Sequence, residues 1–187
     1  MGLPETLTTE ALDLRRWDNA FALEMVKAVN VSLAELRAWM PWAQGDTTVG
    51  DMRIIFSKSL VDFEQGKAWN YCLFEKSSGE LVGSAGLHRE EDPDCPEIGY
   101  WIRTDRTRRG YATQAARALA QAAFAFLGDV HRVKICVDQA NTASAAVARK
   151  LGFHFLREEV QAIEATAHTG TVAVWVIGRD DVALDAY

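Results

Sequence analysis

The sequence has few of the residues that mark a metal centre, a disulfide framework or a membrane segment. Its three cysteines, Cys72, Cys95 and Cys136, are odd in number and far apart, and its four histidines lack the spacing of a zinc site. No run of about 18 apolar residues occurs, and the N-terminus has no charged-then-apolar leader. We therefore expect a cytoplasmic protein with no metal and no membrane span.

Basic residues are also in the minority. The chain has 20 Lys and Arg against 26 Asp and Glu, a formal net charge of −6. Nucleic-acid-binding proteins normally carry a basic stripe, so this class is not expected. An acidic surface suits a cationic amine as partner, although solubility is the commoner reason for such a charge.

The hydrophobic content is that of a globular protein, 49% over 187 residues. This length predicts one domain over residues 1–187 with a substantial core. Period-two patterns predict strands at 11–15, 69–74, 81–87, 97–102, 132–137 and 172–177. Helical spacing predicts helices at 18–29, 33–39, 50–64, 112–127 and 142–151, with a capping box at 32–35 and helix ends at Gly128 and Gly152.

The most informative stretch runs from Glu97 to Ala115, a strand followed by a basic loop with one glycine and then an Ala-rich helix. A helix that opens from such a loop presents unpaired backbone N–H groups and the positive end of its dipole, which together bind phosphate. Gly110 permits close approach, and Arg106, Arg108 and Arg109 would add positive charge. Seen alone, such a loop is more often only a turn.

This stretch resembles the acetyl-CoA-binding motif of the GNAT superfamily of N-acetyltransferases, whose loop follows the pattern Arg/Gln-x-x-Gly-x-Gly/Ala. Residues 107–112 fit with one departure, Thr107, where the family usually has Arg or Gln. A second motif follows at 141–153, with Asn-x-x-Ser at its start and Lys-Leu-Gly-Phe at its end. The wording of both motifs, and of residues 40–42 and 81–87, is similar to the RimJ/RimL branch, enzymes that acetylate protein N-termini, chiefly of ribosomal proteins.

The resemblance implies an α+β GNAT fold, in which a mixed, mostly antiparallel sheet is flanked by helices and a central parallel strand pair splays apart. It implies acetyl-CoA as cosubstrate and a strand bulge, near Gly99 to Ile102, that leaves backbone groups free. It also implies that Pro41 and Trp42 help to shape the substrate groove, whereas core packing is favoured for Trp39. The cofactor-binding residues that it implies are Tyr100, Trp101, Ile102, Arg108, Arg109, Gly110, Tyr111, Ala112, Thr113, Asn141 and Ser144.

Acetyl transfer to an amine needs a base, and a carboxylate that faces the cleft can serve. Glu97, at the entrance of the central strand, is our candidate, although a solvated charge at a strand end is an equal alternative. His88 and Glu90 or Glu91 are rivals nearby in the sequence.

The departing thiolate benefits from an acid, which many GNAT enzymes supply as a tyrosine in the second motif. Ala148 stands at that position, and the resemblance to the RimJ/RimL branch implies Ser144 as substitute, with Asn141 binding the pantetheine arm or the nearby backbone. Helix capping is the alternative role for both residues. No cysteine lies in either motif, so we expect direct transfer rather than a covalent acetyl-enzyme.

Three functions remain open at this point. The chain is expected to acetylate a protein N-terminus, or a small amine such as a polyamine, amino acid or aminoglycoside, or to bind acyl-CoA without catalysis. A homodimer through the sheet edge and the C-terminal hairpin is left open.

Overall fold

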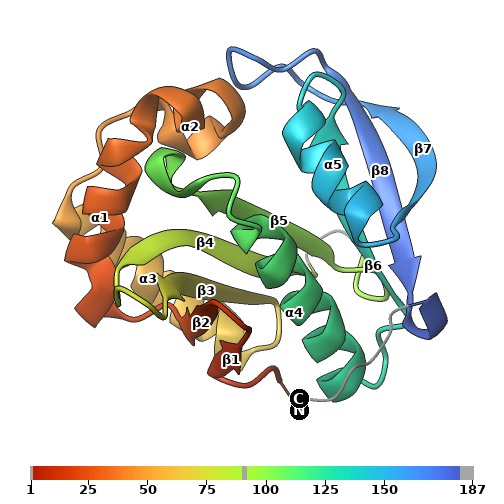
Figure 1. The fold of residues 1–187 in the computed structure, drawn as a ribbon, viewed down its shortest axis with the longest axis horizontal. Helices are drawn as coiled ribbons and strands as arrows, with labels where there is room; N and C mark the ends of the chain where they lie inside the picture. Colours follow the sequence, from red (N-terminus) through yellow and green to blue (C-terminus); the bar gives the residue numbers. More distant parts are fainter. Residues whose placement is uncertain (1, 90–91, 182–187) are drawn as a thin grey trace.

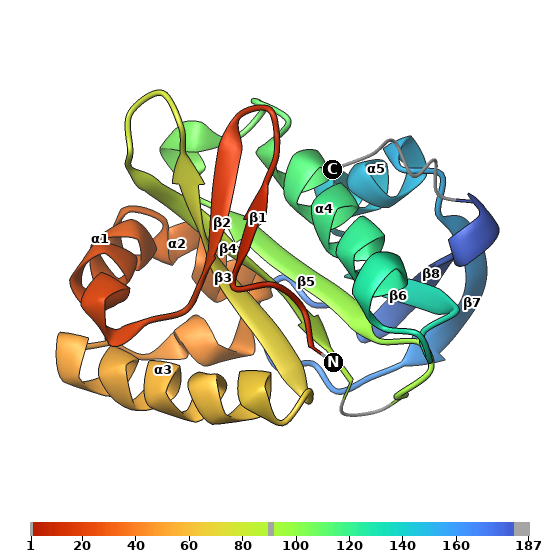
Figure 2. The same ribbon diagram turned by 90° about the horizontal axis from the view of Figure 1, so that it is seen from below.

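The computed structural model describes residues 2–89 and 92–181. Its strands form one eight-stranded sheet in the order β1-β2-β3-β4-β5-β6-β8-β7, with helices α1 to α3 on one face and α4 and α5 on the other (Figures 1 and 2). The strands are β1 (Thr6–Thr8), β2 (Leu12–Arg16), β3 (Ala68–Glu75), β4 (Leu81–His88), β5 (Glu97–Ile102), β6 (Arg132–Asp138), β7 (His154–Val160) and β8 (Thr171–Gly178). The helices are α1 (Ala22–Val31), α2 (Leu33–Trp39), α3 (Val49–Glu64), α4 (Tyr111–Phe126) and α5 (Thr142–Lys150).

The central strands separate along most of their length. Strands β5 and β6 are parallel and pair at one position, Glu97 with Lys134, whereas every other neighbouring pair is antiparallel. In Figure 1 the two strands diverge from this point. The α+β fold class and the splayed parallel pair are thus confirmed. The bulge predicted near Gly99 is wrong, because residues 97–102 pair with 83–88 without a shift in register.

Two hydrophobic cores hold the sheet between its helical layers. The larger core packs α4 on the sheet, where Leu119 and Ala123 are fully buried against Val133 and Ile135. The smaller one packs α1 and α3 on the other face, around Phe56. The 3.6-residue period of α4 and the alternation of β6 produce these contacts, as the sequence pattern predicts.

Local signals were less reliable at element ends. Strands β1 and β7 were not predicted: β1 has three residues, and β7 is an edge strand with a mostly exposed surface. Gly128 and Gly152 were both predicted to end their helices, and each directly follows the C-cap residue, Leu127 or Leu151; only Gly152 has a positive φ angle, 83°. Helix α3 begins with an unpredicted capping box, Thr48 and Asp51. Within the described ranges, no helix is long and apolar enough to span a bilayer.

Candidate active site

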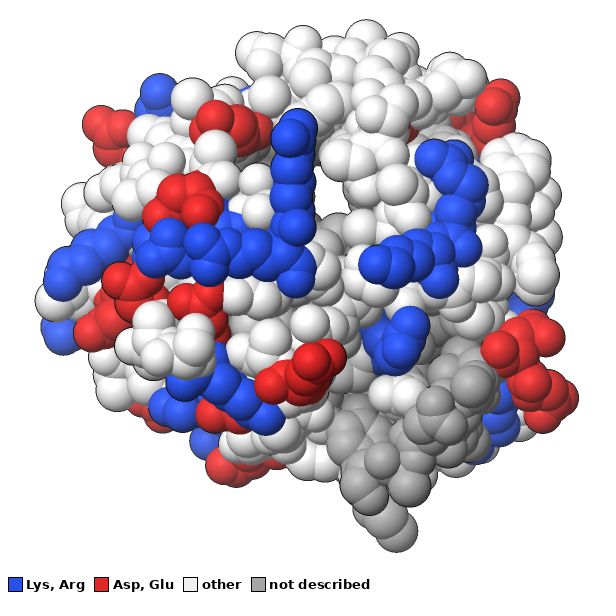
Figure 3. All heavy atoms as spheres, viewed as in Figure 1, with Lys and Arg blue, Asp and Glu red and all other residues white. Residues whose placement is uncertain are grey.

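A cleft of about 1200 Å³ lies where β5 and β6 separate. Its lining comes from β4 and β5, the N-terminus of α4, the end of β6, the start of α5, and the α1–α2 region. Figure 3 shows a central opening in this face, with Lys and Arg side chains on both sides. The separation of β5 and β6 therefore produces a cavity, not a packed interface, and this cavity is large enough for an extended ligand.

The loop before α4 has the backbone of an anion-binding site. Gly110 is the N-cap in the left-handed region, with φ 79° and no side-chain cap, and Arg108 has φ 62°, unusual for a non-glycine residue. A Cβ atom at Gly110 would meet no atom within 4 Å, so the space before the helix is open. Uncapped N–H groups at a helix start, next to left-handed residues, form the cradle that phosphate groups occupy.

At the opposite end of β5, a carboxylate and an imidazole enter the same cleft. Glu97 and His88 are direct cross-strand partners, and both line the cleft. The next pair on the same face of the sheet is Gly86 with Gly99. The Asn70 and His88 side chains occupy the space at Gly86, whereas a Cβ atom at Gly99 would meet no atom within 4 Å, so the cleft is open there. A carboxylate beside such a hollow is suited to removing a proton from a bound amine.

Ser144 faces the strand of Glu97 from α5. Its backbone N–H donates to Asn141 Oδ1 at 3.1 Å, so Asn141 is the N-cap of α5. Its Oγ lies 2.9 Å from the hydroxyl of Tyr100, a β5 residue. Burial raises the pKa of Tyr100 to about 12, so this phenol stays protonated at neutral pH. Hydroxyl groups from two elements therefore meet across the splay.

A family model described as an acetyltransferase (GNAT) domain matches residues 11–154 of this sequence. The chain belongs to the GNAT acetyltransferase family. YdaF of Bacillus subtilis (strain 168), provisionally named a ribosomal N-acetyltransferase, is 38% identical over 76 residues, 40% of this chain. That match spans 41% of YdaF, less than half of its length.

Solved structures show the same fold over nearly the whole chain. The ribosomal L7/L12 α-N-protein acetyltransferase RimL, in complex with CoA, has a TM-score of 0.84 at 24% identity, covering 93% of this chain and 98% of RimL. The microcin C7 self-immunity acetyltransferase MccE, in complex with acetyl-CoA and AMP, has a TM-score of 0.82 at 19% identity, covering 91% of this chain and 93% of MccE. This GNAT chain thus shares its fold with an acetyltransferase of a ribosomal protein and with an acetyltransferase of microcin self-immunity.

All but one of the predicted site residues of this GNAT chain line the cleft. They are Glu97, Tyr100, Trp101, Ile102, Arg108, Gly110, Tyr111, Ala112, Thr113, Asn141 and Ser144. Arg109 is the exception, because its side chain turns away to Glu75. Of the rival bases, His88 is in the cleft, and Glu90 and Glu91 lie outside the described residues.

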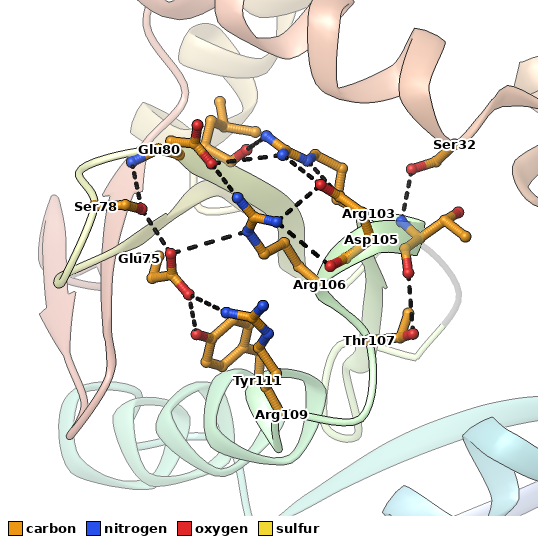
Figure 4. Close-up of polar contacts among 12 residues, drawn as sticks. Ser32, Glu75, Ser78, Glu80, Arg103, Asp105, Arg106, Thr107, Arg109 and Tyr111 are labelled. Atoms are coloured by element: carbon orange, nitrogen blue, oxygen red, sulfur yellow. Dashed lines mark hydrogen bonds and ion pairs between the residues drawn. The ribbon is translucent and has the colours of Figure 1, made fainter.

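Glu75, at the end of β3, contacts the residues on both sides of Gly110 in the loop before α4, residues 107–110, which we call the phosphate loop (Figure 4). Its carboxylate is 6% exposed, and it accepts hydrogen bonds from Ser78 Oγ at 2.6 Å, from Arg109 Nη1 at 3.0 Å and from the Tyr111 hydroxyl. The hydrogen bonds from Ser78 and Tyr111 lower the pKa of Glu75. The side chains of Arg109 and Tyr111 therefore anchor the loop to β3. Because the Tyr111 hydroxyl is bound to Glu75, it is the backbone N–H of Tyr111 that is suited to contact a ligand in the cleft.

A second ion-pair group stiffens the turn between β5 and the loop. Arg103 binds Asp105 through two hydrogen bonds of 2.7 Å, which lower the pKa of Asp105 to about 2. Arg106 contacts the same carboxylate at 2.9 Å and Glu80 of the β3–β4 hairpin at 2.6 Å. The sequence suggested that Arg106 and Arg109 would add positive charge for a phosphate, but both are engaged with carboxylates.

Ser32 has an unexpected place in this site. The predicted capping box is wrong, because the Ser32 side chain makes no cap hydrogen bond to α2. It is 1% exposed, and its Oγ accepts a 2.9 Å hydrogen bond from the backbone N–H of Thr104. Figure 4 shows this contact between the helical layer and the turn after β5. The α1–α2 junction is thereby tied to the loop that follows β5.

Cys136 is a cleft residue that the motifs did not reveal. It lies on β6 and lines the cleft near Glu97. Burial, the charge of Glu97 and a hydrogen bond to Glu97 all raise the pKa of this thiol. A thiol that stays protonated is a poor nucleophile, which agrees with direct transfer.

The wall opposite α5 is aromatic. Trp42 is 49% exposed, and its ring centroid lies 6.3 Å from that of Trp101 on β5. The β7–β8 loop reaches across to α2, where Ala167 N–H donates to Ala38 O at 3.0 Å and His168 Nε2 lies 3.0 Å from Trp39 O. Trp39, partly exposed, also lines the cleft, so the prediction of core packing for Trp39 is wrong.

The phosphate loop permits a sharp test at Gly110. We expect Gly110→Ala to raise the Kd for CoA about tenfold, because a left-handed conformation costs an L residue roughly 1 to 2 kcal/mol and the loop would relax away from it. Gly66→Ala is the matched control: Gly66 has φ 71°, makes only an ordinary contact with Trp69, and does not line the cleft. Calorimetric titration with CoA measures the Kd of both variants. Equal Kd values for Gly110→Ala and Gly66→Ala would show that this loop does not bind CoA.

Proposed function

We propose that this protein transfers an acetyl group from acetyl-CoA directly to a primary amine, most suitably the α-amine of a protein N-terminus. The observation that carries the proposal is that one cleft holds a helix N-terminus with a left-handed loop at one end of β5 and a carboxylate at the other. Such a cleft can bind a phosphate-bearing acyl donor and place its reactive end beside a base.

Each group in the cleft has a role in this proposal. The backbone N–H groups of residues 110–113 bind the pyrophosphate of CoA, whose thioester supplies the activated acetyl group. The unpaired side of β5, over residues 99–102, binds the pantetheine arm and stabilises negative charge on the carbonyl oxygen. Glu97 removes the amine proton, directly or through water, and Ser144 hydrogen-bonds to the departing sulfur.

Two observations bear on the acceptor amine. The names of YdaF, a ribosomal N-acetyltransferase, and of RimL, an acetyltransferase of ribosomal L7/L12, favour a ribosomal-protein N-terminus, which would place the enzyme in the cytoplasm. An extended chain end also suits the groove between Trp42 and the β7–β8 loop. The complex of MccE with acetyl-CoA and AMP, in which a small molecule accompanies the acyl donor, supports a small acceptor as the alternative.

Two measurements test the proposal in sequence. We expect acetyl-CoA and CoA each to bind with a Kd in the micromolar range, about −8 kcal/mol, in calorimetric titration. Turnover is then measured by CoA release against N-terminal peptides of ribosomal proteins and a panel of polyamines, amino acids and aminoglycosides. Preference for a small amine would refute the proposal that the acceptor is a protein N-terminus, while leaving acetyl transfer itself intact. Binding without turnover on any amine would indicate an acyl-CoA-binding domain, and no binding would refute the whole proposal.

A further inference from the structure

The hydroxyl of Tyr100 comes from the middle of β5 and meets Ser144 of α5. The two oxygens lie 2.9 Å apart, and the phenol lies 3.4 Å from the Ser144 carbonyl oxygen, too long for a strong bond. Both residues line the cleft. The Tyr100 ring packs against the main core and the Ser144 backbone N–H is tied to Asn141, so both residues are fixed in place and the two hydroxyl groups are held within reach of each other.

We propose that Tyr100 is a positioning residue that fixes the Ser144 hydroxyl as a donor toward the departing sulfur. The proposal rests on the acetyl-transfer function proposed above. In this chain the tyrosine position of the second motif is occupied by the fully buried Ala148 of α5. Tyr100 instead brings a phenol to the same part of the cleft from β5.

The direction of the hydrogen bond decides what Ser144 can do. A serine hydroxyl has one proton, and if Ser144 donated it to Tyr100, nothing would remain for the sulfur. At 2.9 Å either hydroxyl can be the donor, and we assign this role to the phenol because it is the stronger acid of the two, with Ser144 Oγ as the acceptor. The Ser144 proton is then free to point into the cleft, and accepting a hydrogen bond makes this hydroxyl a better donor.

The chemical step balances without another reactant. The bond from the carbonyl carbon to sulfur breaks, its electron pair stays on sulfur, and the amine nitrogen forms the new bond to carbon. The amine loses one proton to Glu97, and the sulfur leaves as a thiolate that takes up a proton from solvent, to which Glu97 afterwards returns the proton it accepted. Ser144 stabilises the negative charge on sulfur through its hydrogen bond, and Tyr100 remains neutral and keeps the Ser144 rotor in place.

Removal of the phenol oxygen is the direct test. We expect Tyr100→Phe to lower kcat about tenfold while the Kd for CoA stays within twofold, because one neutral hydrogen bond in the transition state is lost. In the Ser144→Ala background the same change should have no further effect on kcat, since Tyr100 acts through Ser144. Tyr71→Phe is the matched control, because the Tyr71 hydroxyl also donates a partly buried hydrogen bond, to Pro4 O, but Tyr71 does not line the cleft.

A measurement without turnover checks the contact itself. In protein labelled with ¹³C at tyrosine Cζ, Ser144→Ala should shift the Tyr100 resonance and leave that of Tyr71 unchanged. An unshifted resonance overturns the proposal, as do an unchanged kcat in Tyr100→Phe, additive losses in the double variant, or a tenfold rise in the Kd for CoA. Absence of turnover on every amine by the unaltered enzyme would instead refute the function, and this proposal with it.

Discussion

Replacing Glu97 with glutamine is expected to lower kcat by about 100-fold or more, with the Kd for acetyl-CoA unchanged. A positioned general base contributes about 10² to 10⁴ to a rate, and an amide of the same shape cannot accept the amine proton. Glu97 begins β5 and the phosphate loop follows its other end, about 16 Å away at the rise of a strand. The measurement is steady-state CoA release at saturating amine, together with calorimetry.

Two matched variants separate a base from a mere charge in the cleft. Glu35 also lines the cleft, from α2, and Glu35→Gln should leave kcat within about twofold, since no chemistry is assigned to it. His88→Gln tests the rival base, which is the direct cross-strand neighbour of Glu97. A large loss of kcat in His88→Gln with near-normal turnover in Glu97→Gln would transfer the role to the histidine.

The sequence allowed the centre of this fold to be predicted because its signals are local. The alternation in β6, the periodicity of α4, and Gly110 before a helix each depend on residues adjacent in the chain. The second motif likewise places Asn141 and Ser144 in one helical turn. Most elements predicted from such patterns agree with the structure to within one or two residues at their ends. The helix predicted at 18–29 is the exception, because Asp18 caps a 3-10 turn at 19–21 and α1 begins only at Ala22.

The parts that were missed depend on contacts between distant residues. Ser32 fits a capping box in sequence, but in the fold its Oγ accepts a hydrogen bond from a backbone N–H 72 residues away. The Tyr100 and Ser144 hydroxyls are 44 positions apart, and Cys136 enters the site only because β5 and β6 separate beside it. No periodicity or motif contains this information, since tertiary packing decides which polar groups meet.

The sequence does contain an indication of the role of Glu75, because this carboxylate ends a mostly apolar strand and a buried charge there needs partners. In the structure it is the buried member of a group that joins β3 to the start of α4. Its partners Arg109 and Tyr111 flank Gly110, so the stability of the fold and the geometry of the phosphate loop share one carboxylate. A variant at this position should therefore affect both properties.

We expect Glu75→Gln to lower the free energy of unfolding by about 2 kcal/mol at pH 7 and to raise the Kd for CoA severalfold. Hydrogen bonds to a charged group contribute roughly 1.5 to 3 kcal/mol, and an amide keeps the shape but not the charge. Glu80→Gln is the control: Glu80 also contacts Arg106 but is 48% exposed, so its loss should cost less than about 1 kcal/mol.

The pH dependence of the stability lost in Glu75→Gln tests whether the charge of the carboxylate is its cause. Because the pKa of Glu75 is lowered in the folded protein, its carboxylate stabilises the fold above the unfolded pKa of about 4.3, and this stability is lost as the pH falls through the folded pKa. Urea unfolding of the unaltered protein and of Glu75→Gln between pH 7 and pH 3 measures this. The difference between their free energies of unfolding should be constant above about pH 5 and become smaller below it. A difference that stays constant down to pH 3 would mean that the glutamine disturbs packing, and that the ionised carboxylate is not what holds the loop.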